Sequence, residues 1–91
     1  MLRRVIRVEN RLGLHARAAA RLVRTASRFE SQIKLTSLSN TKETDGKDIL
    51  GVMLLAASCG TELQITAEGR DEDAAIAELV QLVQENFQEP K

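Results

Sequence analysis

One histidine and a nearby arginine are the residues of this sequence that are most able to do chemistry. His15 is the only histidine among 91 residues, and Arg17 follows two positions later. His15 stands where a turn around Gly13 ends and a helix is predicted to begin, so the free N–H groups of the first helical turn point towards it. The helix dipole and Arg17 both disfavour a charged imidazolium. Both penalties vanish when an anion occupies the position, because free N–H groups and a guanidinium together bind phosphate.

The chemistry that this arrangement favours is transient phosphorylation of the imidazole. A neutral ring can attack a phosphoryl group and form a phosphohistidine, and a partner protein can supply the rest of the catalysis. The structural alternative is that His15 only caps the helix or lies on the surface. A metal site is disfavoured, because there is no second histidine and the nearest potential ligand in sequence is Glu9. We expect no metal and no cofactor.

The length and composition limit what the chain can be. A chain of 91 residues predicts a single domain, 1–91, with one modest core and no room for a full nucleotide-binding apparatus. One cysteine, Cys59, excludes an internal disulfide and is interpreted as structural or incidental. No apolar run is long enough to span a membrane, and no signal segment opens the chain. We therefore expect a cytoplasmic protein, and we expect a monomer because the apolar surface left exposed is small.

The net charge of zero conceals a strong polarity along the chain. Residues 1–28 carry a charge of +7 and residues 62–91 a charge of −6. The arginines of the first predicted helix recur every three or four residues and share one face: Arg17, Arg21, Arg24 and Arg28. This row is either a solvated face or a docking surface for an acidic partner. Nucleic acid is disfavoured, because the chain has no Trp or Tyr and only two Phe.

The elements that must position these residues follow from hydrophobic periodicity. The sequence predicts strands at 2–9, 32–38 and 62–67, a short polar edge strand at 41–44, and helices at 16–28, 49–55 and from a cap at Asp71 to before Pro90. Alternation within the strands favours an antiparallel sheet with helices on one face. The side chains expected in the core are Leu2, Ile6, Val8, Ala19, Leu22, Val23, Ala26, Ile33, Leu35, Leu63, Ile65, Ala67, Ile76, Leu79, Val80, Val83 and Phe87.

The middle helix is apolar or small on every side and is capped by Asp48. A helix lying on a sheet buries one side, so we expect Ile49, Val52 and either Met53 or Leu55 to face the core. Leu50 and Leu54 would then be exposed as an apolar contact patch. The alternative is a fully buried short helix.

Two segments resemble the signatures of a known family. The segment GLHARAA at 13–19 resembles the active-site segment of the HPr family, the histidine-containing phosphocarriers of the bacterial phosphoenolpyruvate-dependent phosphotransferase system. The segment DILGVMLL at 48–55 is similar to the second signature of that family. Gly60-Thr61-Glu62 and Glu68-Gly69 also fit, so the resemblance covers essentially the whole chain.

The resemblance implies a fold and a function. The fold would be an α+β open-faced β-sandwich of order β-α-β-β-α-β-α, with a four-stranded antiparallel sheet covered on one face by three helices. Enzyme I would phosphorylate His15 at Nδ1, with help from Arg17 and the backbone of Ala16 and Arg17, and His15 would pass the group to a IIA domain. The protein would thus be a carrier that depends on enzyme I. The docking surface of the family falls on Ala16, Ala20, Arg21, Arg24, Ile49, Leu50 and Met53.

The sequence departs from the family at three positions. Ala18 stands where proline is usual, which removes some rigidity from the first helical turn but no N–H donor. Asp48 stands where Gram-positive members carry a regulatory serine, so control by a serine kinase is expected to be absent; the carboxylate either partly imitates the modified form or only caps the helix. Leu12 replaces a polar residue of some sugar-branch members. Residues 10–14 also resemble the nitrogen-branch paralogue of the family. The sequence therefore does not decide between the sugar branch and the nitrogen branch of the phosphotransferase system.

Two other functions compete with phosphoryl transfer. The chain could be a regulatory adaptor of the same fold that binds an enzyme or a transcriptional regulator without carrying phosphate; the presence of His15 argues against this. It could also be a small ligand- or RNA-binding domain. The absence of stacking aromatic residues and of a GxxG-type loop argues against that alternative.

Overall fold

The computed structural model describes residues 1–88, which form a four-stranded sheet and the helices that cover it. The elements are β1 (Leu2–Arg7), α1 (Ala16–Ala26), β2 (Gln32–Ser37), β3 (Glu43–Asp45), α2 (Ile49–Leu54), β4 (Glu62–Glu68), α3 (Glu72–Gln84) and a 3-10 turn, η1 (Asn86–Gln88). Every predicted element is present, and the ends lie within two residues of the prediction except at the last helix, which stops at Gln84 and is followed by η1. The predicted position of Pro90, past the last helix, lies outside the described residues.

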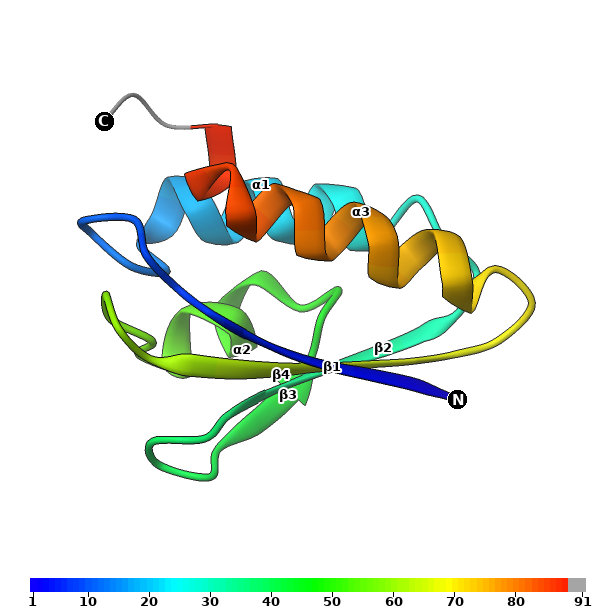
Figure 1. The fold of residues 1–91 in the computed structure, drawn as a ribbon, viewed down its shortest axis with the longest axis horizontal. Helices are drawn as coiled ribbons and strands as arrows, with labels where there is room; N and C mark the ends of the chain where they lie inside the picture. Colours follow the sequence, from blue (N-terminus) through cyan, green and yellow to red (C-terminus); the bar gives the residue numbers. More distant parts are fainter. Residues whose placement is uncertain (89–91) are drawn as a thin grey trace.

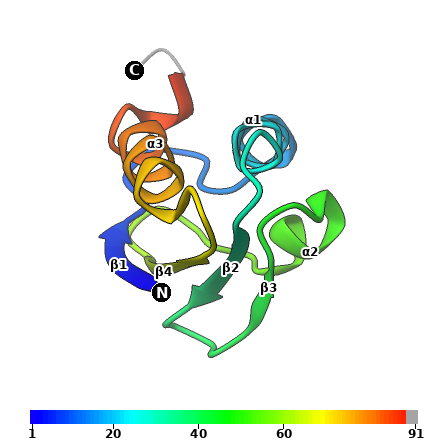
Figure 2. The same cartoon turned by 90° about the vertical axis from the view of Figure 1, so that its right-hand side faces the viewer.

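The strands are all antiparallel and lie in the order β1-β4-β2-β3. Figure 1 shows α1 and α3 above one face of the sheet, and Figure 2 shows them side by side. The third helix, α2, packs against α1 and β3. The opposite face of the sheet carries no helix within residues 1–88, so the predicted open-faced α+β architecture is confirmed.

The core lies between the sheet and the helices, where the predicted alternation places it. Every second residue of β4 is fully buried, namely Leu63, Ile65 and Ala67. From above, α1 contributes Leu22 and α3 contributes Leu79, both fully buried. Complete burial of a leucine or isoleucine stabilises the fold by about 1.5–3 kcal/mol relative to exposure. Within residues 1–88, no helix is long and apolar enough to cross a membrane.

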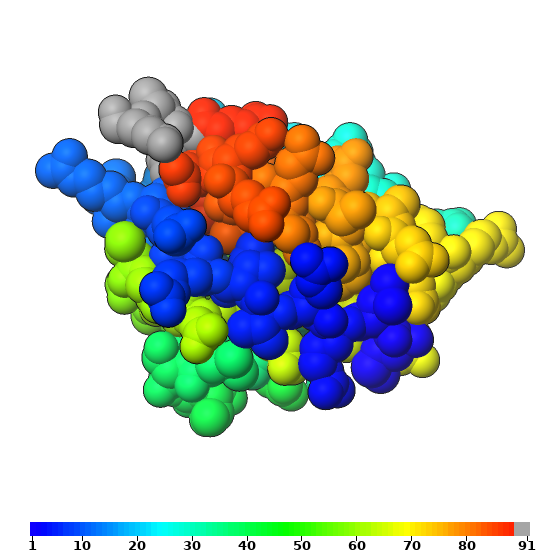
Figure 3. Space-filling model, viewed as in Figure 1, coloured from blue at the N-terminus to red at the C-terminus, as the bar shows by residue number. Residues whose placement is uncertain are grey.

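The first strand is shorter than predicted. It ends at Arg7, where the chain leaves the sheet for the loop that leads to α1. Val8 is nevertheless fully buried, as expected, and its N–H donates to the carbonyl of Thr61 at 2.9 Å. Figure 3 shows the N-terminal residues (blue) at the surface beside α3, the helix that packs against β1. The carbonyl of Val8 also accepts from Gly60 N at 2.7 Å, which ties the start of the loop to the turn before β4.

The last helix also ends before the predicted point. The side chain of Phe87 is fully buried, as expected, but it belongs to η1 and has a positive φ of 56°. The chain turns after Gln84 and brings Phe87 back onto the core. The helical spacing predicted the burial of this side chain and missed the change in backbone direction.

The prediction for α2 was wrong at Ile49. Val52 and Leu55 face the core, with 0% and 1% of their surface exposed, whereas Ile49 is 44% exposed. Ile49 is the first residue of a six-residue helix, and helical side chains lean towards the N-terminus. Its side chain therefore extends past the contact with α1 and β3. Leu50 and Leu54 are each 63% exposed, as predicted.

Asp71 does not cap α3 with its side chain, contrary to the prediction. Its carboxylate accepts hydrogen bonds from Glu30 N at 2.9 Å, from Ser31 N at 3.0 Å and from the Ser31 hydroxyl at 2.5 Å. These bonds join the start of α3 to the connection between α1 and β2. The Ser31 hydroxyl above all, together with the N–H of Glu30, holds the pKa of Asp71 below its ordinary value of 3.8.

We expect Asp71→Asn to lower the urea midpoint at pH 7 and to flatten its dependence on pH. A carboxylate whose pKa is lowered by folding stabilises the folded state above its unfolded pKa of about 3.9, and this stability is lost as the pH falls through the folded pKa. The measurement is urea unfolding at several pH values from 7 to 3. Asp73→Asn, at an exposed position in the first turn of α3, is the control. Equal midpoints for the two variants at pH 7 would show that the Asp71 contacts contribute nothing.

Candidate functional site

His15 lies at the junction between the loop 10–15 and α1. Its backbone is extended (φ −73°, ψ 177°), which makes it the N-cap residue of the helix. Its carbonyl accepts the first helical hydrogen bond, from Ala19 N at 2.8 Å. The side chain is half-buried. The structure therefore places the imidazole at the positive end of α1, where the sequence predicted it.

The imidazole also has a defined orientation. Its Nδ1 accepts a hydrogen bond from Arg17 N at 3.2 Å. A ring nitrogen that accepts carries a lone pair, so in the neutral ring the proton resides on Nε2. Nδ1 therefore faces the N-terminal end of α1.

The loop before His15 is held by contacts that the sequence did not predict. Asn10 is 4% exposed, and its side-chain amide donates to the carbonyl of Gly13 at 2.7 Å. Gly13 N donates back to the carbonyl of Asn10 at 3.1 Å, and Leu14 N donates to that of Ala57 at 2.8 Å. Gly13 has a φ of +63°, which glycine adopts without strain. A polar residue five positions before the histidine gave no signal of its burial.

The four predicted arginines have different environments. Arg21 donates to the carbonyl of Phe87 at 2.5 Å, and Arg28 forms an ion pair with Glu78 at 2.6 Å. These two side chains connect α1 to η1 and α3. Arg17 and Arg24 are exposed and make no ion pair within residues 1–88. Two members of the predicted row thus also make contacts within the fold, and the docking role of the row stays a prediction.

An apolar patch lies on the neighbouring helix. Its members are the exposed side chains of α2: Ile49, Leu50, Met53 and Leu54, of which Met53 is 40% exposed. Because α1 packs against α2, this apolar patch lies on the helix next to exposed Ala16, half-buried Ala20 and exposed Arg24. The structure thus brings the predicted partner-binding residues together on two adjacent helices (Figure 2).

Asp48 and Cys59 both make local contacts. Asp48 caps α2, because its Oδ1 accepts a hydrogen bond from Gly51 N at 3.2 Å. The predicted role of Asp48 as a helix cap is confirmed. Cys59 is exposed, and its thiol donates to the carbonyl of Glu9 at 3.6 Å.

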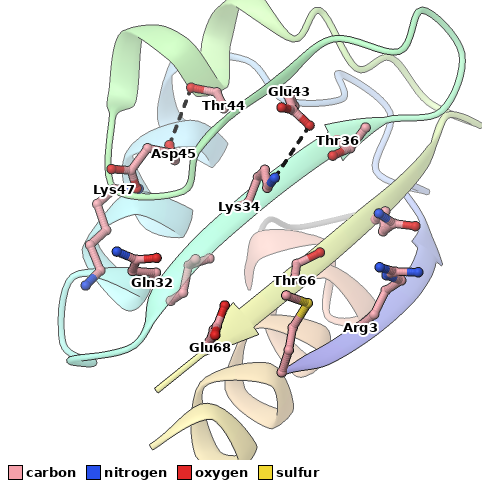
Figure 4. A pocket seen from close by; sticks show the side chains of 13 residues that line it. Arg3, Gln32, Lys34, Thr36, Glu43, Thr44, Asp45, Lys47, Thr66 and Glu68 are labelled. Carbon is pink, nitrogen blue, oxygen red and sulfur yellow. Dashed lines mark hydrogen bonds and ion pairs between the residues drawn. The ribbon is translucent and has the colours of Figure 1, made fainter. Parts of the chain in front are cut away.

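A concave region lies on the open face of the sheet (Figure 4). This hollow has a volume of about 580 Å³ and is lined by side chains of mixed charge, including Arg3, Lys34, Asp45 and Glu68. Its lining includes neither His15 nor any predicted partner-binding residue. Within residues 1–88, no three His, Cys, Asp or Glu side chains are grouped to hold a metal ion.

Known proteins match this chain over nearly its whole length. A family model described as the PTS HPr component phosphorylation site matches residues 2–85. Phosphocarrier protein HPr of Treponema pallidum is 46% identical over 89 residues, 98% of this chain and 99% of that protein. The crystal structure of HPr-C-His from Thermoanaerobacter tengcongensis is 42% identical, covers 100% of both chains and has a TM-score of 0.93. The solution structure of Crh, the Bacillus subtilis catabolite repression HPr, is 39% identical, covers 92% of this chain and 98% of its own, and has a TM-score of 0.67.

These similarities agree with the two motifs and with the fold. The matched family model spans the histidine segment 13–19 and the α2 segment 48–55. The relative from Treponema pallidum and the structure from Thermoanaerobacter tengcongensis are both above 40% identical and cover almost the entire chain. The chain therefore belongs to the HPr family, the phosphocarrier proteins of the phosphotransferase system.

Proposed function

We propose that His15 accepts a phosphoryl group from enzyme I, which is charged by phosphoenolpyruvate, and passes it to a IIA protein or domain. The observation that carries this proposal is the orientation of His15, whose Nδ1 faces the first free N–H groups of α1. A lone pair aimed at a helix N-terminus lies where the charge of a bound phosphoryl group is stabilised. The chain acts as a carrier and needs enzyme I as the donor.

The transfer is a displacement at phosphorus. Nδ1 of His15 supplies the electron pair of the new N–P bond, while the bond from phosphorus to the donor atom breaks and leaves its electron pair on that atom. The Nε2 proton of His15 passes to solvent as the departing donor atom takes one up. The second transfer repeats these steps with phospho-His15 as the donor. No redox partner is required, so the protein contributes positioning and charge stabilisation.

Two groups next to His15 stabilise the transferred phosphoryl group. The backbone N–H groups of Ala16 and Arg17 belong to the first turn of α1, whose amides lack intrahelical partners. The exposed guanidinium of Arg17 neutralises part of the added charge. In the free protein, the N–H of Arg17 donates to Nδ1 itself, so phosphorylation replaces one acceptor with another.

The docking surface for both partners comprises the exposed face of α1 and the apolar patch of α2. It includes Ala20, Arg24, Ile49, Leu50 and Met53. Arg21 supports this surface indirectly, because its bond to the carbonyl of Phe87 connects α1 to η1. An apolar centre with a basic rim fits a partner whose own surface is apolar and acidic. The carboxylate of Asp48 lies at the start of α2, beside this surface.

A regulatory adaptor is the second candidate function. The similarity to a structure named Crh, the Bacillus subtilis catabolite repression HPr, favours it. An adaptor would bind a transcriptional regulator or an enzyme without carrying phosphate. The histidine of this chain and its orientation support the carrier function instead.

The deciding experiment is phosphorylation in a defined mixture. The chain is incubated with enzyme I, Mg²⁺ and labelled phosphoenolpyruvate, and we expect one phosphate per chain that is labile in acid and stable in base. Adding a IIA protein should then discharge it. An unlabelled chain beside a labelled reference HPr would exclude the carrier function and favour the adaptor.

Arg17→Ala is expected to lower kcat for phosphorylation by enzyme I roughly 10- to 100-fold, the value of a hydrogen bond to a charged group. The fold should remain intact, because the Arg17 side chain is exposed. Arg24→Ala is the matched control on the same helix, and we expect it to raise KM for the chain while kcat stays the same. Initial rates at varied chain concentration separate the two effects. An Arg17→Ala variant with unchanged kcat would remove the guanidinium from the mechanism.

A further inference from the structure

The backbone N–H of Ala18 is a buried donor at the proposed phosphoryl site. Ala18 is the third residue of α1, and none of its surface is exposed. The neighbouring donors are used, because Arg17 N donates to His15 Nδ1 and Ala19 N donates to the His15 carbonyl. Across the described part of the chain, the N–H of Ala18 makes no hydrogen bond.

A buried backbone N–H without an acceptor is rare in folded proteins. The N–H groups of the first helical turn all point out of the N-terminal end of the helix, towards the capping side chain. Here that side chain is the imidazole of His15, so the unpaired donor and the Nδ1 lone pair are directed into the same small region.

We propose that the N–H of Ala18 donates to an oxygen of the phosphoryl group on His15, as a third backbone donor beside Ala16 and Arg17. This inference rests on the proposed function and adds a binding group to the same site. It applies to this chain in particular, because the proline that the family resemblance implies at this position has no N–H. The bond is absent from the free protein and forms with the phosphoryl group.

One consequence is that this chain holds its phosphoryl group more tightly than a variant with proline at position 18. Alanine supplies a donor aligned with the helix axis, and the helix dipole strengthens a hydrogen bond to a dianion there. Proline fits the first turn of a helix sterically, so Ala18→Pro removes the donor with little change in the backbone. The matched control is Ala18→Gly, which keeps the N–H.

The first measurement needs no variant. The chain is phosphorylated with phosphoramidate, which transfers its phosphoryl group to an imidazole nitrogen and releases ammonia, so enzyme I is not involved. In ¹H–¹⁵N spectra we expect the amide proton of Ala18 to move downfield on phosphorylation, and further than that of Ala19, whose bond to the His15 carbonyl persists. An Ala18 amide that moves no further than the Ala19 amide would overturn the proposal.

The second measurement is a competition for phosphate. Equal amounts of the natural chain and Ala18→Pro are equilibrated with catalytic enzyme I and limiting phosphoenolpyruvate, and the two phosphorylated masses are compared. We expect the natural chain to hold roughly ten times more phosphate, in line with one charge-assisted hydrogen bond, and Ala18→Gly to compete nearly equally. A ratio near one for Ala18→Pro would contradict the role of Ala18 while leaving the carrier function intact. Labelling by phosphoramidate but not by enzyme I would contradict the carrier function, and the amide shift would still decide the role of Ala18.

Discussion

His15→Ala is expected to take up no phosphate from phosphoenolpyruvate and enzyme I, which is the largest loss predicted for any substitution in this chain. The reason is chemical, because His15 is the only imidazole in the sequence. No other side chain of the site can form an N–P bond in this way, since the guanidinium of Arg17 is a hydrogen-bond donor and offers no nucleophilic nitrogen. The measurement is the acid-labile, base-stable label after incubation with both reagents.

The control for this variant must preserve the helix cap. Nδ1 of His15 accepts from Arg17 N, so alanine removes a capping bond that is worth about 1 kcal/mol in typical helices. Asparagine is among the best N-cap residues and cannot carry a phosphoryl group as imidazole does. His15→Asn should therefore be as inactive as His15→Ala but closer to the natural chain in urea midpoint. Full labelling of either variant would show that the phosphate resides on another residue.

Short-range patterns predicted most of the fold. Alternation in the segment 62–67 located the buried face of β4, and the spacing of Leu79 and Val83 located that of α3. A histidine between a glycine turn and a helix was sufficient to place the candidate site at the helix N-terminus. Each of these inferences depends on contacts within a few residues, which sequence periodicity reports directly.

Some contacts were not predicted because the partner residue is distant in sequence. Asp71 is of a residue type that favours helix N-caps, and it directly precedes α3. Its carboxylate nevertheless bonds to Ser31, 40 residues earlier. The helical spacing of Arg21 likewise did not predict that its guanidinium reaches the carbonyl of Phe87, 66 residues later. Rules such as helix capping and helical spacing describe how a side chain behaves within its own helix or strand. Tertiary contacts can override that behaviour. The burial of Asn10 was also not predicted, although its side-chain amide bonds locally, to the carbonyl of Gly13.

Gly13→Ala is expected to weaken both the fold and phosphoryl transfer. At a φ of +63°, alanine costs about 1–2 kcal/mol more than glycine. A Cβ at this position would also lie 2.4 Å from the Ala57 carbonyl oxygen and 2.8 Å from the Cα of Ser58, both backbone atoms that cannot rotate away. Forced packing of this kind adds about 1–3 kcal/mol, which urea unfolding will measure.

The same clash should reduce the transfer rate, because the affected backbone positions His15. Leu14 N donates to the carbonyl of Ala57 at 2.8 Å, and Leu14 directly precedes the histidine. A displacement of about 1 Å in a reacting group can cost roughly a hundredfold in rate, and we expect a loss of this order for Gly13→Ala. Gly60→Ala is the matched control, since Gly60 also has a positive φ, +96°, but a Cβ there would meet no atom within 4 Å. We expect that variant to lose stability through backbone strain alone and to keep its transfer rate when assayed well below its unfolding midpoint. If both glycine variants transferred at the rate of the natural chain, the packing of the loop against Ala57 would have no part in holding the imidazole in position.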